Sequence, residues 1–133
     1  QLEDLIKSSD CYLSLHRSEG LGRPLAEAML NNIPIICTGW SGNLDFMNHN
    51  TAFLVDYKLI NVGEDYPNGE GCVWAEPNID DAALKMRQVF RLSRQEKTTM
   101  CDYARLELIS VRSIKALSES YNTRFLQIFK HLS

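Results

Sequence analysis

Two glutamates, Glu19 and Glu27, flank a glycine-rich turn in the segment HRSEGLGRPLAEAML, residues 16–30. Gly20 and Gly22 let the main chain approach a ligand with no side chain in the way. A helix that begins just after Gly22 would direct free N–H donors and a partial positive charge at this turn. The segment therefore predicts an anion site that suits a diphosphate, although a tight strand-to-helix turn also uses glycine for its geometry alone.

The spacing of the glutamates places a carboxylate on each side of that anion site. Glu27 lies roughly 7–8 Å further along the helix axis than Gly22, at the usual rise per residue. A carboxylate repels a phosphate but accepts two hydrogen bonds from neighbouring hydroxyl groups. Because a nucleotide sugar has hydroxyl groups on both sides of its diphosphate, we expect Glu19 and Glu27 to bind this class of molecule. The alternative for Glu27 is a solvent-facing helix position, but its neighbours are nearly all apolar.

The elements that must position these residues alternate between strands and helices. We expect a strand over 11–16, a first turn over 18–22, a helix over 23–32 and a strand over 33–38. Pro24 suits the start of that helix, where its missing N–H costs nothing. A strand, a helix and a strand in this order form a right-handed parallel unit, and open sheets of this kind bind ligands at the carboxyl ends of their strands. The fold class expected is therefore α/β.

A second glycine-bearing turn, residues 39–43, follows the second strand and belongs to the same end of the sheet. The other expected elements are a helix that ends near Ser8 to Asp10, a short helix over 44–48, strand-like segments over 51–57 and 58–63, a polar stretch over 64–71, a polar loop or hairpin over 72–77, and helices over 79–93, 95–108 and 113–131.

Two of these helices carry apolar stripes that we interpret as core. In the helix over 79–93 the stripe comprises Ala83, Met86, Val89 and Phe90. In the last helix one face carries Ile114, Leu117, Tyr121, Phe125 and Ile128, and this surface is widened by Leu126, Phe129 and Leu132. The alternative for the last helix is a partner surface, and part of its stripe would be exposed if the rest of a longer protein is missing.

Length and composition indicate a single globular domain over residues 1–133. An apolar fraction of 44% and a charged fraction of 23% are typical of such a domain, and no apolar run approaches the roughly 20 residues of a membrane span. A net charge of −3 offers no basic field to nucleic acid, which we exclude as a partner. Because the chain has neither an initiator methionine nor a leader, we expect a piece of a longer protein.

The cysteines do not have the spacing of a zinc site or a redox dithiol. They are Cys11, Cys37, Cys72 and Cys101. We expect four free thiols, no metal site and a reducing, cytoplasmic environment. Cys11 and Cys37 lie in apolar runs, where a small buried hydrophobic residue is the simpler interpretation.

Residues 14–47, with FLVDY and WAEP further on, resemble the C-terminal half of the retaining glycosyltransferases of family 4. In that family the E-x7-E motif corresponds to Glu19 and Glu27 of this chain. The resemblance implies a GT-B fold of two Rossmann-like domains, of which this would be the three-layer donor-binding domain with a parallel sheet. By the resemblance Glu19 contacts the transferred sugar and is the catalytic residue, while Glu27 contacts the ribose. Main-chain amides around the first turn would bind the diphosphate, at Gly20, Leu21 and Gly22.

The chain departs from this family in its second turn and in its basic residues. Where the family often has two adjacent glycines followed by a glutamate, the chain has Ser41, Gly42 and Asp45. We keep Ser41 and Gly42 as expected donor contacts. The basic residues that neutralise the diphosphate in the family usually lie before the start of this chain, so Arg23 is the candidate here. The alternative for Arg23 is a solvated surface side chain.

Three further side chains lie beside the expected site. His16 is a candidate acid or base, or a hydrogen-bond donor to the leaving phosphate, and the alternative is a packed or solvated histidine at a strand end. Trp40 and Trp74 could wall a ligand pocket, although core packing is the simpler interpretation for both.

The resemblance implies transfer of a hexosyl group from a UDP- or GDP-linked donor by front-side displacement, without a cofactor or a metal. It also implies a role in bacterial polysaccharide or lipopolysaccharide synthesis, with mannose as the first sugar to test. The acceptor domain would belong to the missing part of the chain, which could also contact the inner face of the membrane. We therefore expect the isolated 133 residues to be inactive.

Two other classes of function stay open. The first is a noncatalytic nucleotide-binding or scaffold module of the same fold. The second is a dinucleotide-dependent oxidoreductase. The turn EGLGRP lacks the G-x-G-x-x-G pattern, and no acidic residue follows the next strand at the position that would bind the ribose of such a cofactor.

Overall fold

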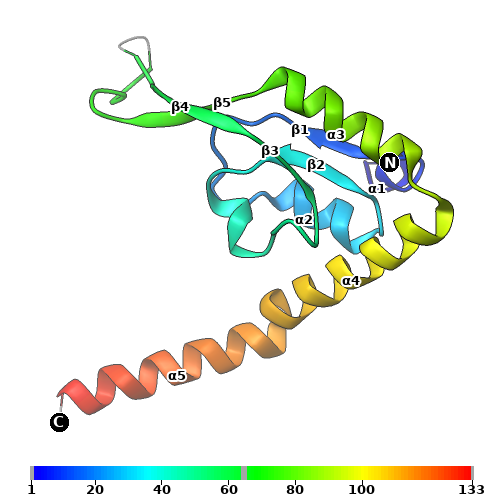
Figure 1. Ribbon diagram of the computed structural model, residues 1–133. Helices are drawn as coiled ribbons and strands as arrows, with labels where there is room; N and C mark the ends of the chain where they lie inside the picture. The colour runs from blue at the N-terminus through cyan, green and yellow to red at the C-terminus, as the bar shows by residue number, and fades with distance from the viewer. Residues whose placement is uncertain (1, 64–65, 133) are drawn as a thin grey trace.

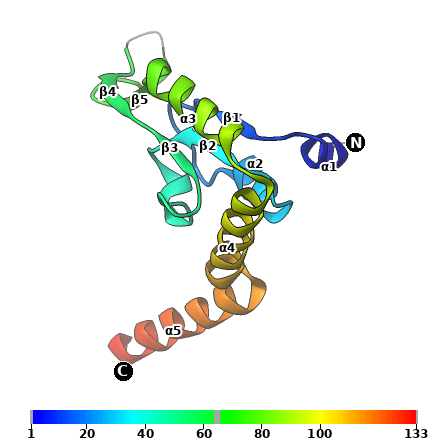
Figure 2. The same ribbon diagram turned by 45° about the vertical axis from the view of Figure 1, so that its right-hand side comes forward.

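A three-stranded parallel sheet forms the middle layer of the computed structural model, which describes residues 2–63 and 66–132 (Figure 1). Helices cover both faces of the sheet, as Figures 1 and 2 show. The predicted α/β class, with three layers and a parallel sheet, is confirmed. The strands, in their order across the sheet, are β1 (Tyr12–Ser14), β2 (Ile35–Thr38) and β3 (Phe53–Val55).

The remaining elements surround this sheet or extend from it. An antiparallel hairpin leaves the end of β3, and its strands pair from Tyr57 with Pro77 to Asn61 with Val73. The segment predicted as a polar loop or hairpin is thus the second strand of a hairpin. In chain order these elements are α1 (Leu2–Lys7), α2 (Arg23–Leu30), η1 (Gly42–Asp45), β4 (Tyr57–Asn61), β5 (Val73–Pro77), α3 (Ile79–Arg91), α4 (Arg94–Arg112) and α5 (Ile114–Leu132).

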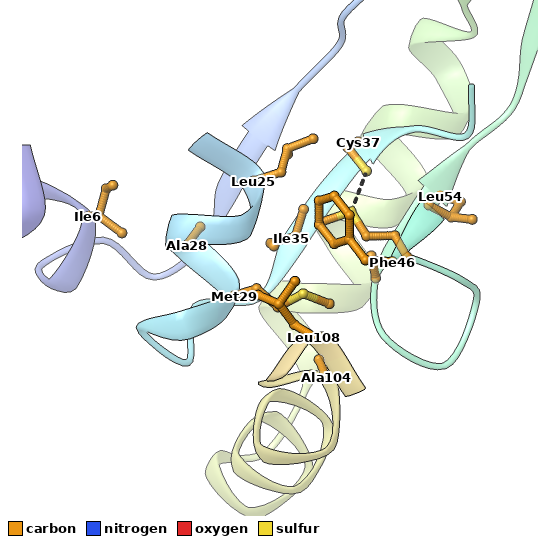
Figure 3. Packing of buried hydrophobic residues seen from close by; sticks show 12 residues of the cluster. Ile6, Leu25, Ala28, Met29, Ile35, Cys37, Phe46, Leu54, Ala104 and Leu108 are labelled. Carbon is orange, nitrogen blue, oxygen red and sulfur yellow. Dashed lines mark hydrogen bonds between the residues drawn. The ribbon is translucent and has the colours of Figure 1, made fainter. Parts of the chain in front are cut away.

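The central strand β2 is buried along its whole length because it has a neighbour on each side and helices above and below. Successive side chains of a strand point to opposite faces. Ile35 and Cys37 therefore pack toward α2 and α4, as Figure 3 shows, whereas Ile36 packs toward α3. The sheet thus has a large core on one face and a smaller core on the other.

Local capping explains where two of the helices begin. The Asn78 side chain accepts a hydrogen bond from the Asp81 amide at the start of α3. At the start of α4, Ser93 and Glu96 bond each other's amides in a capping box. Helix α4 extends past the predicted end at residue 108 to Arg112, since no glycine or proline interrupts that stretch.

The predicted core stripe of α3 is only partly correct. Val89 is buried, but Met86 and Phe90 are 51% and 86% exposed. Ala82, which the stripe omitted, is buried in the smaller core. A three-stranded sheet offers too narrow a face to cover the whole apolar side of this helix.

The interpretation of α5 as a core helix is wrong. After Ser113 the chain turns away from the sheet, and α5 leaves the body with α4 as its main neighbour (Figures 1 and 2). Its apolar stripe is consequently exposed, with Ile114 at 89% and Phe125 at 56%. The partner-surface alternative describes this helix better.

The cysteines are free thiols, as predicted. Cys37 and Cys101 are buried, Cys11 is half-buried and Cys72 is exposed, so the expected burial holds fully for Cys37 and partly for Cys11. Across residues 2–63 and 66–132, none of the helices has the length and apolar character that crossing a membrane requires.

Candidate functional site

The first and second turns lie against each other at the carboxyl ends of β1 and β2. The Gly42 amide donates a hydrogen bond of 3.0 Å to the Glu19 carbonyl oxygen. A Cβ atom on Gly42 would lie 1.8 Å from the Gly20 carbonyl oxygen, so only glycine allows this approach. The two turns that the sequence placed at one end of the sheet are therefore a single packed unit.

Ser41 binds the main chain of Glu19 through its hydroxyl group. The Glu19 amide donates to Ser41 Oγ at 2.9 Å, and Ser41 Oγ donates in turn to the Glu19 carbonyl oxygen. The Ser18 hydroxyl lies 3.4 Å from Ser41 Oγ. The contacts of the Ser41 hydroxyl are thus internal, whereas the sequence placed Ser41 among the residues that bind the donor.

The Glu19 side chain itself is half-buried. Within the described part of the chain, its carboxylate has no hydrogen-bond or ion-pair partner. A few residues later Gly22 precedes the first residue of α2 with φ +77°, and no side chain caps this helix. An uncapped helix N-terminus beside a free carboxylate can bind an anion that also carries hydroxyl groups.

Glu27 lies on the surface of α2 in an ion pair with Arg23, whose Nε is 2.9 Å from Glu27 Oε1. The two side chains are 35% and 84% exposed, so the pair is weak. Both residues line a largely apolar groove of about 520 Å³ between α2 and the junction of α4 with α5. Other lining residues include Leu21, Phe46, Arg112 and Leu117.

Both ring nitrogens of His16 are occupied within the protein. Nε2 lies 3.1 Å from the Trp40 carbonyl oxygen and 3.1 Å from Asn43 Oδ1, and Nδ1 lies 3.1 Å from the Ser14 hydroxyl. Because both partners of Nε2 are acceptors, Nε2 carries the proton and Nδ1 accepts from Ser14. This arrangement corresponds to the packed alternative for His16, which joins the end of β1 to the second turn.

Asn43 is a central residue of this arrangement that the sequence did not single out. It is fully buried, and its amide donates to the Thr38 carbonyl oxygen at 3.2 Å and to Cys37 Sγ at 3.6 Å. Burial raises the pKa of the Cys37 thiol to about 12, so this thiol stays protonated at neutral pH. A polar residue in a turn carries no sequence signal of such burial.

Asp45 and Arg112 form a second contact that sequence reasoning missed. Arg112 Nη2 lies 3.0 Å from Asp45 Oδ2, and the guanidinium carbon is 5.9 Å from the centre of the Phe46 ring. Asp45 occupies a position at which the family that the chain resembles often has a glutamate. Here its carboxylate pairs with Arg112, the last residue of α4. The pair joins the end of η1 to the elbow between α4 and α5.

The base of the hairpin contacts Arg17, just before the first turn, and Trp40 of the second turn. Arg17 pairs with Glu76 at 2.6 Å, and its guanidinium carbon lies 5.0 Å from the centre of the Trp74 ring. On the other side Trp40 packs against Tyr57, with ring centres 5.4 Å apart. Trp40 and Trp74 are both half-buried, so they support the turns from the side without entering the core.

No metal site accompanies this arrangement in the part of the chain that the structure describes. Across residues 2–63 and 66–132, no three His, Cys, Asp or Glu side chains are placed to hold an ion. Two basic side chains, Arg23 of α2 and Arg112 of α4, line the groove next to the turns.

No curated protein matches the chain. The family model described as glycosyl transferases group 1 matches residues 1–106 of the 133, a stretch that contains the sheet, both turns and both glutamates. The chain therefore belongs to the group 1 glycosyltransferase family.

Proposed function

We propose that the chain is the donor-binding domain of a retaining glycosyltransferase that uses a nucleotide sugar. The observation that supports this most directly is the Glu19 carboxylate, which has no partner among the described residues and belongs to the residue three positions before Gly22, where α2 begins without a side-chain cap. One group accepts hydrogen bonds from hydroxyls and the other binds an anion. A nucleotide sugar has both the hydroxyl groups and the anionic diphosphate that these two groups would bind. Such a ligand suits a member of a glycosyltransferase family.

The diphosphate binds at the first turn. Main-chain amides around Gly20, Leu21 and Gly22 approach its oxygens, and the positive end of the α2 dipole favours its charge. Arg23 lies at the start of the same helix with an 84% exposed side chain, so it can swing toward the phosphates at little cost.

Glu27 binds the ribose. Arg23 occupies only one of its carboxylate oxygens, Oε1, in an exposed pair that contributes little. Two ribose hydroxyls can replace this contact and use both oxygens. The groove of about 520 Å³ beside Glu27 is in the size range of small-molecule sites and has room for a nucleoside.

The reaction that follows is a front-side displacement. The bond between the anomeric carbon and the diphosphate oxygen breaks, and the acceptor oxygen forms a new bond to that carbon on the same face. The acceptor proton passes to the leaving diphosphate, whose charge the α2 N-terminus stabilises. Glu19 holds the sugar hydroxyls during this exchange, and the acceptor comes from a second domain that the 133 residues do not include.

The experiment is a calorimetric titration of the chain with UDP, GDP and their hexose derivatives. We expect one nucleotide to bind and Glu27→Gln to weaken it by roughly 10- to 100-fold, since hydrogen bonds to a charged acceptor are lost. The matched control is Asp80→Asn on α3, which removes one negative charge on the opposite face of the sheet. It should leave the affinity within about twofold.

Two outcomes would contradict the proposal. If no nucleotide or nucleotide sugar binds, the chain is a noncatalytic scaffold of the same fold. If a nucleotide binds with the same affinity to Glu27→Gln as to the unaltered chain, Glu27 is a surface residue and the ribose lies elsewhere.

A further inference from the structure

Ser41 has a backbone conformation that side chains normally avoid. Its φ and ψ are +84° and −157°, a region that is essentially restricted to glycine. The other non-glycine residues with positive φ in the described part of the chain are Asn32 and Asn68, at 57° and 59°. These φ values are those of the left-handed region, which asparagine adopts more readily than most residues. The conformation of Ser41 is therefore strained in a way that theirs is not.

The hydroxyl group of Ser41 gives a reason for a serine at this strained position. It accepts a hydrogen bond from the Glu19 amide and donates one to the Glu19 carbonyl oxygen. A hydroxyl is a small group that can do both at once, and glycine has nothing to replace it. Together with the bond from the Gly42 amide, three hydrogen bonds hold the main chain of Glu19.

The Glu19 carboxylate has no such support. Because it has no partner within the described residues, its direction depends on the main chain that carries it. Looser main-chain contacts would let the carboxylate sample more positions before a ligand binds. Ordering it on binding would then cost affinity.

We propose that Ser41 is a positioning residue, whose hydroxyl holds the main chain of Glu19 so that the carboxylate is already directed at the transferred sugar. This inference rests on the proposed function, in which Glu19 binds the sugar and the first turn binds the diphosphate. It gives Ser41 a role through Glu19, with no contact of its own to the donor.

The test compares the affinity for a nucleotide sugar with that for the corresponding nucleoside diphosphate. Ser41→Ala removes both side-chain hydrogen bonds and keeps a side chain in the strained backbone conformation. Ser41→Gly removes the same bonds and also the strain, because glycine adopts this conformation readily. In both variants we expect the affinity for the nucleotide sugar to fall about tenfold relative to the affinity for the nucleoside diphosphate. The affinity for the diphosphate itself should stay within about twofold of that of the unaltered chain. A general loss of structure would weaken both ligands together.

Ser8→Ala is the matched control, because the exposed Ser8 hydroxyl donates to the Leu5 carbonyl oxygen at the end of α1 and lies ahead of β1, away from both turns. It should keep the ratio of the unaltered chain. Exchange of the Glu19 amide hydrogen with solvent gives a second readout, and it should accelerate in both Ser41 variants and not in the control.

The outcomes separate the two proposals. An unchanged ratio in Ser41→Gly, with the diphosphate still bound, overturns the positioning role and leaves the donor site intact. If Ser41→Ala does not fold, Ser41→Gly decides alone, since it carries no strained side chain. If the unaltered chain binds no nucleotide, the proposed function fails and this inference fails with it.

Discussion

Glu19 and Glu27 show how the same side chain acquires different properties from its surroundings. Glu19 has three hydrogen bonds on its main chain and a carboxylate without a partner among residues 2–63 and 66–132. Glu27 lies in a regular helix, and its carboxylate is paired with Arg23. In the proposed donor site Glu19 can therefore accept hydroxyl groups before a ligand arrives, whereas Glu27 would first have to give up its weak contact with Arg23.

Burial of the Cys37 thiol makes the stability of the protein depend on alkaline pH. Its pKa rises from 9.0 to about 12 because the folded chain removes it from water. Between these values the unfolded chain releases the proton and the folded chain keeps it. The free energy of unfolding should therefore fall as pH rises above 9, by up to about 1.4 kcal/mol per pH unit. Below pH 9 both states hold the proton and this contribution is fully present.

Urea unfolding at pH 8.5 and 10.5 would measure this effect, with Cys37→Ala as the comparison. The variant leaves a small cavity, so its stability at any one pH is not informative, but the difference between the two pH values is. We expect that difference to be smaller in Cys37→Ala. Equal differences in both proteins would show that other groups cause the alkaline loss.

At the scale of elements, the contact between the two turns depends on the absence of a side chain at Gly42. An alanine there would place its Cβ 1.8 Å from the Gly20 carbonyl oxygen and 3.0 Å from that of Glu19. The main-chain atoms cannot yield without separating the turns. We expect Gly42→Ala to destabilise the protein by about 1–3 kcal/mol, or more if the turns separate fully, as measured by urea unfolding.

Gly20→Ala is the matched control for this prediction. It lies in the first turn, opposite Gly42, but a Cβ added to Gly20 meets no atom within 4 Å. Its unfolding free energy should stay within about 0.5 kcal/mol of the unaltered chain. Equal effects at the two positions would mean that the turns are not packed as described.

At the scale of the whole molecule, α5 is the element that the rest of the chain covers least. Its apolar stripe is exposed, and α4 is its main neighbour. Among its described residues, Ile114 and Leu117 of its first turn help to line the groove beside Glu27. Among the side chains that the structure describes, α5 contributes none to the large core between the sheet, α2 and α4.

Removal of α5, by truncation after Ser113, should therefore leave a body that still unfolds cooperatively. The fluorescence of anilinonaphthalene sulfonate, which reports exposed apolar surface, should fall because the largest uncovered stripe is gone. Thermal unfolding followed by circular dichroism gives the first result, and dye titration the second. Loss of cooperative unfolding would show that α5 stabilises the core after all.

Much of this protein follows from local sequence patterns. The order of strands and helices, the glycine turns after β1 and β2, and the end of α2 at Asn31 were all predictable, because each depends on residues a few positions apart. For the site, residue types and spacing singled out Glu19, Glu27 and the glycines of the first turn, and their role in binding a donor stays a prediction.

Only the tertiary structure decided which of these groups are free and which are engaged. Arg112 reaches Asp45 across 67 positions, and His16 reaches Asn43 across 27, so no local pattern reports either contact. The strained conformation of Ser41 arises from the approach of two turns that lie apart in the chain. The exposure of α5 depends on where the chain turns after Ser113. The sequence pattern of an apolar stripe is the same whether or not another surface covers it. Side-chain chemistry is local, but its availability is set by contacts between distant segments.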